Sequence, residues 1–441
     1  MKKNVLLFIT VLIFGVLPVA LFAGPLLLIG YPSQSPAIDT LRSAMFYSGN
    51  IERTFWEKQF YMRSNFYKKG FVNSIPISEN KPEMQYKLWL QEKNAPIVYI
   101  IPGLGTHYTG VTVTAFAEIF YLKGYSVVVI SSVFNWEFNQ SASSVLTPGY
   151  TIQDSEDIYN ALFIINNKLN REYPERIGEK YLVGYSLGGL ETLYIADIES
   201  KITDGNKIGF KRYLALNPPV DLLYAMNKID GFYGNSSSWT PNQISKKLTK
   251  AGKVFNNFKN NKLSSSDDLP FTSEEAQYVI GLTFHLTLSE LIFSICQQDN
   301  LGIINTDYSW FSRDNVYKEI DTYNYFSYLN IFLKKYYKTK FGIDFNLEEF
   351  SNSSGLKFIS DTLKNNSSVR IIHTADDFTV SDNDMNWLES TMGDKMILIN
   401  HGGHLGYLFY DKMADVITSS LTEESFVKYH DSELKNQLIL K

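Results

Sequence analysis

The nine residues from Tyr181 to Gly189, YLVGYSLGG, place a G-x-S-x-G sequence between a short apolar run and a segment with helical spacing. A serine at a strand-to-helix turn has a strained backbone, so the residues two positions before and after it must lack side chains. Gly184 and Gly188 meet this requirement, and Gly189 lets the following helix pack closely on a sheet. That helix would present free N–H groups and a partial positive charge beside Ser186. The pattern predicts a nucleophilic serine, with an ordinary Gly-rich turn as the alternative.

Strands and helices alternate on both sides of this stretch. Runs rich in β-branched residues are typical of buried parallel strands, and Met84–Leu90, which alternates polar and apolar residues, is expected at the edge of the sheet. The expected strands are Met84–Leu90, Ile97–Ile101, Ser126–Ile130, Tyr181–Gly184, Tyr213–Leu216, Val369–Ile372 and Met396–Ile399. The expected helices are Thr114–Leu122, Ile152–Leu169, Leu187–Ile198, Asp384–Ser390 and one from about Leu405. This order predicts the α/β class, a mostly parallel sheet flanked by helices.

The alternation stops between about Val220 and Ser353, where helical segments are separated by polar loops. A block of this kind between two strands of one sheet is typical of a cap or lid. We therefore divide the chain into an N-terminal segment (residues 1–30), a first part of the core (31–219), a largely helical cap (220–353) and a second part of the core (354–441).

The N-terminal segment has Lys2 and Lys3 followed by an uncharged, mostly apolar run from Val5 to Gly30. Small residues at Ala20, Ala23 and Gly24 suit cleavage of a signal peptide near Ala23. Left uncut, the run could cross ~30 Å of hydrocarbon with some tilt. A cleaved signal peptide and a retained membrane anchor both remain open. Either one predicts that the rest of the chain works in the cell envelope, outside the cytoplasm, or is secreted.

Composition excludes several classes. Of the 441 residues 44% are hydrophobic and 20% charged, which excludes a wholly disordered chain. The 41 basic and 46 acidic residues give a net charge of −5, so no nucleic-acid partner is expected. The single cysteine, Cys296, excludes an intramolecular disulfide and a multi-cysteine zinc site, and we expect it to be an inert, small hydrophobic residue.

The serine turn, together with the loop Ile101-Pro-Gly-Leu-Gly-Thr-His107, resembles the α/β-hydrolase superfamily. The resemblance extends over roughly Met84–Met413 apart from the insertion. It implies that the backbone N–H groups of Leu104 and Leu187 bind an oxyanion, each contributing on the order of 10²–10³ in rate. Pro102 stands where the family more often has His, but this contact needs only backbone.

The resemblance also implies the order nucleophile, acid, histidine, which places the acid after the insertion. The residues 371–380, IIHTADDFTV, end a predicted strand with Asp376 and Asp377. In the family the acid is usually followed three positions later by Val or Ile, and Asp377 with Val380 has that spacing. Asp377 is therefore favoured over Asp376, which would cap the loop through backbone hydrogen bonds.

The residues 400–406, NHGGHLG, follow the last predicted strand and resemble the family's histidine loop. This favours His404 over His401 as the general base. The H-x-x-H spacing would also suit a metal, but without a nearby cysteine or an H-E-x-x-H pattern we expect none. We expect the other histidines to be a core residue (His373), a solvated loop residue (His107) and two residues without a spacing signal (His285 and His430).

Together these residues predict covalent acyl transfer by Ser186, Asp377 and His404, with no metal or organic cofactor. A serine nucleophile argues against the dehalogenases and epoxide hydrolases of this fold, for which the resemblance implies Asp. The leading hypothesis is an esterase-like or lipase-like hydrolase of carboxylic esters. The alternatives are a serine peptidase or thioesterase of the same fold, and a catalytically silent, membrane-tethered binding protein.

The insertion contains one long apolar stretch, Gln277–Ile295. Over the mouth of a site it would favour an acyl chain, whereas packing of the lid on the main domain is the alternative explanation. Gln277, His285 and Glu290 interrupt it, so we do not expect it to span a membrane. The expected partner is a small-molecule or lipid-like acyl substrate, and any membrane association would come through the N-terminus.

Overall fold

The computed structural model describes residues 25–46 and 65–422, apart from residue 204 and residues 260–262, 264–266, 308–312, 345 and 411. The segment expected to be a signal or anchor lies outside the described residues up to residue 24, as does His430.

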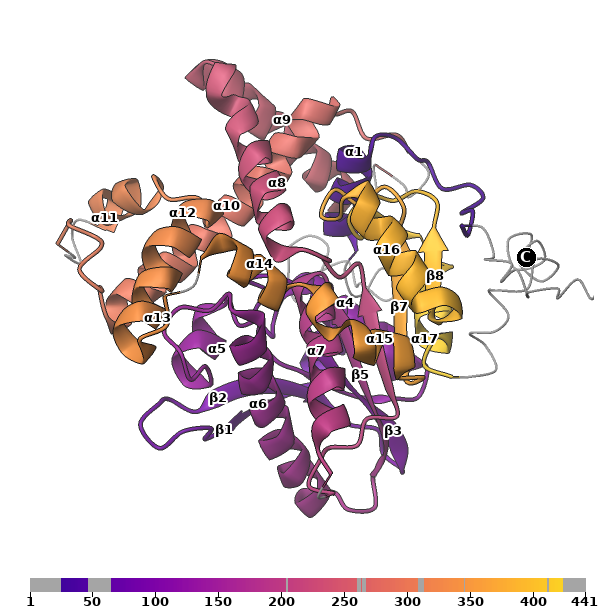
Figure 1. The fold of residues 1–441 in the computed structure, drawn as a ribbon. Coiled ribbons are helices and arrows are strands. Elements are labelled where there is room, and N and C mark those ends of the chain that lie inside the picture. The colour runs from indigo at the N-terminus through magenta and orange to yellow at the C-terminus, as the bar shows by residue number, and fades with distance from the viewer. Residues whose placement is uncertain are drawn as a thin grey trace, which may run out of the picture.

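One eight-stranded sheet forms the centre of the molecule, in the order β1-β2-β4-β3-β5-β6-β7-β8 (Figure 1). The six strands from β3 to β8 are parallel, and β1 and β2 are antiparallel to their neighbours. The strands are β1 (Phe71–Ile75), β2 (Met84–Trp89), β3 (Ala95–Ile101), β4 (Ser126–Val129), β5 (Ile177–Tyr185), β6 (Arg212–Leu216), β7 (Val369–Thr374) and β8 (Met396–Ile399). The predicted class, a mostly parallel sheet flanked by helices, is confirmed.

The prediction that Met84–Leu90 lies at the sheet edge is wrong. β1 is the edge strand, and β2 lies between β1 and β4. The alternation in β2 is misleading because Lys87 is buried, with its ammonium 2.9 Å from the centre of the Tyr67 ring, a cation–π contact. β1 was not predicted because most of its residues are exposed, so it shows no hydrophobic pattern; Phe71 is 66% exposed.

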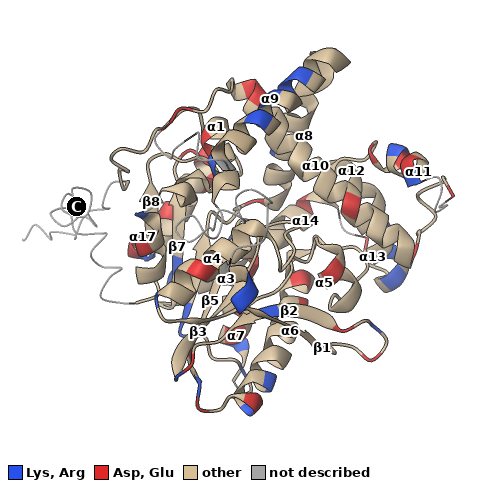
Figure 2. Cartoon of the chain, turned by 180° about the vertical axis from the view of Figure 1, so that it is seen from behind, with Lys and Arg blue, Asp and Glu red and all other residues tan. Residues whose placement is uncertain are grey.

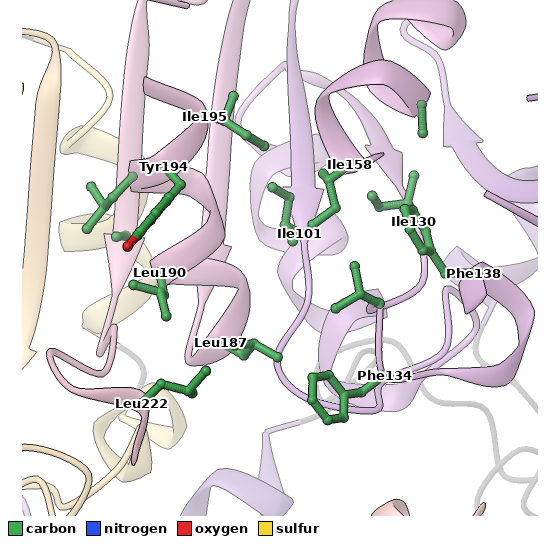
Figure 3. Close-up of a cluster of buried hydrophobic side chains, with 14 of the residues drawn as sticks. Ile101, Ile130, Phe134, Phe138, Ile158, Leu187, Leu190, Tyr194, Ile195 and Leu222 are labelled. Atoms are coloured by element: carbon green, nitrogen blue, oxygen red, sulfur yellow. The ribbon is translucent and has the colours of Figure 1, made fainter. Parts of the chain in front are cut away.

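Helices cover both faces of the sheet. On one face lie α6 (Thr151–Glu172), α7 (Leu187–Lys201) and α16 (Asp382–Met392), which bury residues such as Ile158 and Leu190 in one cluster with side chains of β3. Figure 3 shows Ile158 beside Ile101 of β3. On the other face lie α4 (Val111–Leu122) and α17 (Met413–Ser419). The helix expected from about Leu405 is in two pieces, because a 3₁₀ turn, η6 (Gly406–Phe409), precedes α17. Basic and acidic residues are interspersed in the view of Figure 2.

Between β6 and β7 the described residues form helices, several of which extend above and to the left of the sheet in Figure 1. They are α8 (Leu222–Gly234), η2 (Asn235–Ser238), α9 (Pro241–Lys259), α10 (Ser273–Gln298), α11 (Arg313–Ile320), α12 (Tyr325–Ser327), η3 (Tyr328–Leu333), α13 (Lys334–Phe341), α14 (Leu347–Ser354), η4 (Leu356–Ile359) and α15 (Ser360–Asn365). Below, "cap" means α8 to α14.

Helix α10 is the longest element of the cap, and a capping box of Thr272 and Glu275 begins it. A Cβ on Gly281 would lie 2.2 Å from the backbone nitrogen of Tyr233, so only glycine allows α10 to pack this closely on α8. Among the described residues, α10 alone is long and apolar enough to cross a membrane by those two criteria, and half of its most apolar stretch is buried inside the protein. We interpret it as the core helix of the cap.

The segment at residues 25–46 is bound to both the sheet and the cap. Leu26 forms a parallel bridge to Ile399, the last residue of β8, and the segment continues into α1 (Pro36–Leu41) and η1 (Arg42–Met45). α1 packs on α10 and on η6. The buried Arg42 lies 3.4 Å from the buried Asp39 and donates hydrogen bonds to the carbonyls of Pro32 and Asp267.

Replacing Arg42 by Ala leaves the buried carboxylate of Asp39 without its cationic partner. We therefore expect the free energy of unfolding to fall by about 3–5 kcal/mol. Lys211→Ala is the control, because Lys211 and Glu179 form an ion pair whose side chains are about half exposed, and its loss should cost ~0.5 kcal/mol. Urea unfolding followed by circular dichroism measures both. Equal effects would mean that Arg42 does not tie the segment to the core.

Candidate active site

Ser186 lies at the turn between β5 and α7, with a positive φ of 56° that is rare and strained for a residue other than glycine. A Cβ on Gly184 would lie 2.0 Å from the carbonyl oxygen of Gly188, and a Cβ on Gly188 would lie 2.2 Å from that of Ile101. The backbone N–H of Ser186 donates to the carbonyl of Leu216 at the end of β6. The two glycines are therefore a steric condition of the turn, as the sequence predicts.

The structure brings together the three side chains singled out by the sequence. Nε2 of His404 lies 2.8 Å from Oγ of Ser186, and Nδ1 of His404 lies 2.8 Å from Oδ2 of Asp377. His404 and Asp377 are buried. The result is a continuous hydrogen-bonded chain from a carboxylate through an imidazole to a hydroxyl.

Both oxygens of Asp377 accept further hydrogen bonds. The backbone N–H and the hydroxyl of Thr379 donate to Oδ1 at 2.8 and 2.9 Å, and the side-chain amide of Asn217 donates to Oδ2 at 2.7 Å. Burial raises the pKa of Asp377, but the charges of His404 and His373 and the bonds from His404 and Asn217 outweigh it, so the pKa lies below its ordinary value. The carboxylate is therefore held ionised.

Asp376 has a different role. It accepts hydrogen bonds from the backbone N–H of Gly403 at 2.8 Å and of Gly402 at 3.3 Å. Burial raises its pKa, against the effect of these two bonds. Asp376 thus caps the histidine loop, as the sequence predicts for whichever of the two acids does not contact the imidazole.

The histidine loop rests on α1, which sequence reasoning missed. The backbone N–H of His404 donates to Oγ1 of Thr40 at 2.8 Å. A Cβ on Gly403 would lie 2.1 Å from the carbonyl oxygen of Pro36, and one on Gly406 1.9 Å from that of Asp39. The glycines around His404 therefore make room for the backbone of α1.

Asn217, which follows β6, was also missed. Its φ is 45° and its side-chain amide donates to Thr374 as well as to Asp377. An Asn directly after a buried strand, at the same sheet edge as the serine turn, was the available signal. His373, by contrast, is the fully buried core residue that was expected, with its ring nitrogens 2.9 and 3.2 Å from the carbonyl oxygens of Thr374 and Pro218.

The loop after β3 lies against the serine turn, since a Cβ on Gly103 would be 3.1 Å from Cβ of Ser186. A hydrogen bond from the N–H of Gly105 to Ser132 Oγ fixes this loop. In the described part of the chain, the backbone N–H groups of Leu104 and Leu187 donate no hydrogen bond. Two free N–H groups beside a hydroxyl are what binding of an oxyanion requires.

A cavity of about 290 Å³ opens beside Ser186 and His404. It has walls from the N-terminal segment, the loop after β3, the histidine loop, α9 and α10. No Asp, Glu, Lys or Arg is found among the described residues that line it. Its apolar lining is Leu41, Ala44, Leu104, Phe255, Val279, Ile280, Phe284, Leu405 and Leu408.

The remaining candidates lie away from this cavity. His401 is half exposed and 3.9 Å from Asp376, and the ring of His107 lies 4.2 Å from that of Tyr108 in a tilted arrangement. His285 is buried in α10, where burial lowers its pKa, and burial raises the pKa of Cys296 to about 11. Within the described ranges, no three side chains of His, Cys, Asp or Glu are grouped as metal ligands would be.

Because a Cβ on Gly188 would overlap the carbonyl of Ile101, we expect Gly188→Ala to lower the free energy of unfolding by about 2 kcal/mol or more. Gly189→Ala is the matched control: its Cβ would lie 3.2 Å from the carbonyl oxygen of Leu216, and the gain in helix propensity should keep the change within ~1 kcal/mol. Urea unfolding of both variants measures the difference. Equal stability would show that the turn tolerates a side chain at position 188.

No family model matches the chain, and a search of curated proteins finds no match. Solved structures are similar at low identity. A thioesterase domain from the curacin biosynthetic pathway is 13% identical (TM-score 0.37), and the match covers 80% of this chain and 100% of that one. Est1E from Butyrivibrio proteoclasticus is 12% identical (TM-score 0.36), covering 84% and 99%.

A third similar structure is the α/β hydrolase GrgF from Penicillium, 14% identical with a TM-score of 0.39 over 82% of this chain and 98% of that one. The topology of the chain itself is decisive: a mostly parallel eight-stranded sheet has helices on both faces and a serine at the turn after β5. The chain has the α/β-hydrolase fold.

Proposed function

We propose that the protein is a serine hydrolase that cleaves carboxylic esters through an acyl-enzyme. The observation that carries this proposal is the chain of two 2.8 Å contacts joining Asp377, His404 and Ser186 at the wall of an apolar cavity. A hydroxyl is a weak nucleophile unless a base takes its proton, and here the base is itself oriented by a buried carboxylate.

In the proposed first step, His404 Nε2 takes the proton of Ser186 as Oγ attacks the acyl carbon. The negative charge that develops on the carbonyl oxygen is bound by the N–H groups of Leu104 and Leu187. Asp377 stabilises the imidazolium, which then gives its proton to the departing alcohol as the C–O bond breaks. The product of this step is an ester of Ser186.

In the second step, His404 takes a proton from water, and the resulting hydroxide attacks the acyl-enzyme. Collapse of the second tetrahedral intermediate releases the carboxylic acid and returns the proton to Ser186 through His404. Neither step needs a metal or an organic cofactor.

The lining of the cavity disfavours a peptidase that binds a charged chain terminus. A peptidase that binds a charged terminus needs an opposite charge near the scissile bond, and the described lining offers none. Thioesters share the acyl part and differ only in the leaving group, so they are a second outcome of the substrate test below.

We also propose that the catalytic domain works outside the cytoplasm, on the basis of Lys2, Lys3 and the apolar run that follows. Cleavage near Ala23 would leave the bridge from Leu26 to Ile399 in place. A released and an anchored form are therefore both compatible with the described fold, and N-terminal sequencing of the mature protein distinguishes them.

A fluorophosphonate should form a covalent adduct on Ser186, because the proposed chemistry makes its Oγ the one activated hydroxyl. We expect peptide mapping by mass spectrometry to find the adduct there, and Ser186→Ala to lose both the adduct and the hydrolysis of p-nitrophenyl esters. Ser390→Ala on α16 is the control and should be labelled like wild type. Labelling of Ser186→Ala as strong as wild type, or none in either protein, would overturn the proposal. Turnover of acyl-thioesters but not of oxygen esters would favour the thioesterase.

Amide variants of the two adjacent acids, Asp376 and Asp377, should differ sharply in activity. An amide at position 377 would place an N–H₂ group against donors from Asn217, Thr379 or His404, so we expect Asp377→Asn to lose on the order of 10³–10⁴ in kcat. Asp376→Asn keeps an oxygen for Gly403 and should lose less than about tenfold.

Kinetics on p-nitrophenyl butyrate, with thermal unfolding of both variants as the check on folding, tests this. A larger loss in Asp376→Asn than in Asp377→Asn would reverse the assignment of the acid.

A further inference from the structure

We infer that the cavity beside Ser186 is a channel for a single unbranched acyl chain of medium length, about 6–10 carbons. The inference deepens the proposed function and rests on it, since it takes Ser186 as the point of attachment. Four observations carry it: the direction of α10, the opposite wall, the volume, and the absence of Asp, Glu, Lys and Arg among the described residues of the lining.

The direction of the channel follows from α10. Thr287 contacts the loop after β3, because a Cβ on Gly105 would lie 2.1 Å from Thr287 Cγ2. The residues of α10 that line the cavity precede Thr287: Phe284, Thr283, Ile280 and Val279. With a rise of 1.5 Å per residue, these lining residues span ~7.5 Å of the helix, from Val279 to Phe284. The cavity therefore runs from the oxyanion loop toward the beginning of α10.

The opposite wall is the N-terminal segment, which contributes Leu41 and Ala44 from α1 and η1. Phe255 of α9 also lines the cavity and belongs to the same buried cluster as Ile280. Since that cluster includes residues from the first half of α10, Phe255 lies at the end of the channel remote from Thr287.

The extent along α10 and the volume bracket the chain size. Carbon–carbon bonds of ~1.5 Å in an extended chain advance ~1.25 Å per methylene, so ~7.5 Å along the helix accommodates roughly six carbons. A methylene is close in size to a water molecule, which occupies ~30 Å³ in the liquid, so a cavity of about 290 Å³ holds on the order of ten such groups. A longer chain would leave its end in water.

The chemistry of the wall selects an alkyl chain. The polar residues of the lining, apart from His404, are neutral: Thr40, Ser43, Thr106, Thr112, Tyr185, Ser186 and Thr283. A charged group in the channel would lose hydration without a partner, whereas each buried methylene favours binding by roughly fourfold.

The test is kcat/KM for p-nitrophenyl esters from acetate to palmitate, each below its critical micelle concentration. We expect values to rise up to a chain of about 6–10 carbons, hexanoate to decanoate, and to fall for longer chains. Val279→Trp fills the remote end and should cut decanoate hydrolysis by about tenfold or more while acetate changes less than threefold. Phe255→Ala should move the optimum to longer chains. Leu286→Trp, on the same helix but 53% exposed and outside the cavity, should leave the profile unchanged.

Acetate turnover and fluorophosphonate labelling report separately on the catalytic site. If wild type is labelled and hydrolyses acetate but shows no dependence on chain length, or if Val279→Trp and Phe255→Ala leave the profile unchanged, the channel is wrong and the proposed function stands. If Ser186 is not labelled, the proposed function falls and the channel with it. Opposite shifts of the optimum in Val279→Trp and Phe255→Ala support the channel.

Discussion

The strained backbone of Ser186 is the constraint on which the rest of the site depends. A residue with a side chain holds φ at 56° only if its surroundings compensate a cost of about 1–3 kcal/mol. Here the compensation comes from the centre of the sheet: the N–H of Ser186 is bonded to the end of β6, and Gly188 touches the carbonyl at the end of β3. The ends of β3, β5 and β6 therefore fix the position of the Ser186 hydroxyl. The loops after β7 and β8 supply the carboxylate and the imidazole that lie next to it.

Those two loops are fixed by contacts outside the three reacting side chains. Asn217 and Thr379 saturate the oxygens of Asp377, so the carboxylate cannot turn away from His404 without losing hydrogen bonds. His404 is held from the other side by Thr40. The segment after the predicted signal or anchor is thus part of the architecture of the candidate site, and Arg42 links that same segment to the cap through the carbonyl of Asp267.

Sequence reasoning located the serine turn, the buried strands and the loop of Asp377 because the information for each is local. The glycines around Ser186, the β-branched strands and the acid-to-valine spacing at Asp377 are each read within ten residues. It failed where the cause is remote. The glycines at 403 and 406 are required by a backbone more than 360 positions earlier, so nothing near His404 identifies Thr40 as its support. The edge strand β1 was missed because most of its residues are exposed and show no alternation of apolar and polar residues. The burial of Lys87 was missed because it depends on a contact with the ring of Tyr67, which lies outside β2.

The sequence left two explanations for the apolar stretch in the cap, contact with an acyl chain and packing on the main domain, and α10 accommodates both along its length. Its second half buries Leu288, Leu291, Ile292 and Ile295 in the larger core cluster. Its first half presents Val279, Ile280 and Phe284 to the cavity. Thr287, seated on Gly105, lies at the boundary. The same helix that packs the cap on the larger core cluster thereby forms one wall of the cavity beside Ser186, which the proposed selection by chain length requires. A period-3.6 pattern cannot distinguish these two halves, because both need apolar residues and differ only in what lies opposite them.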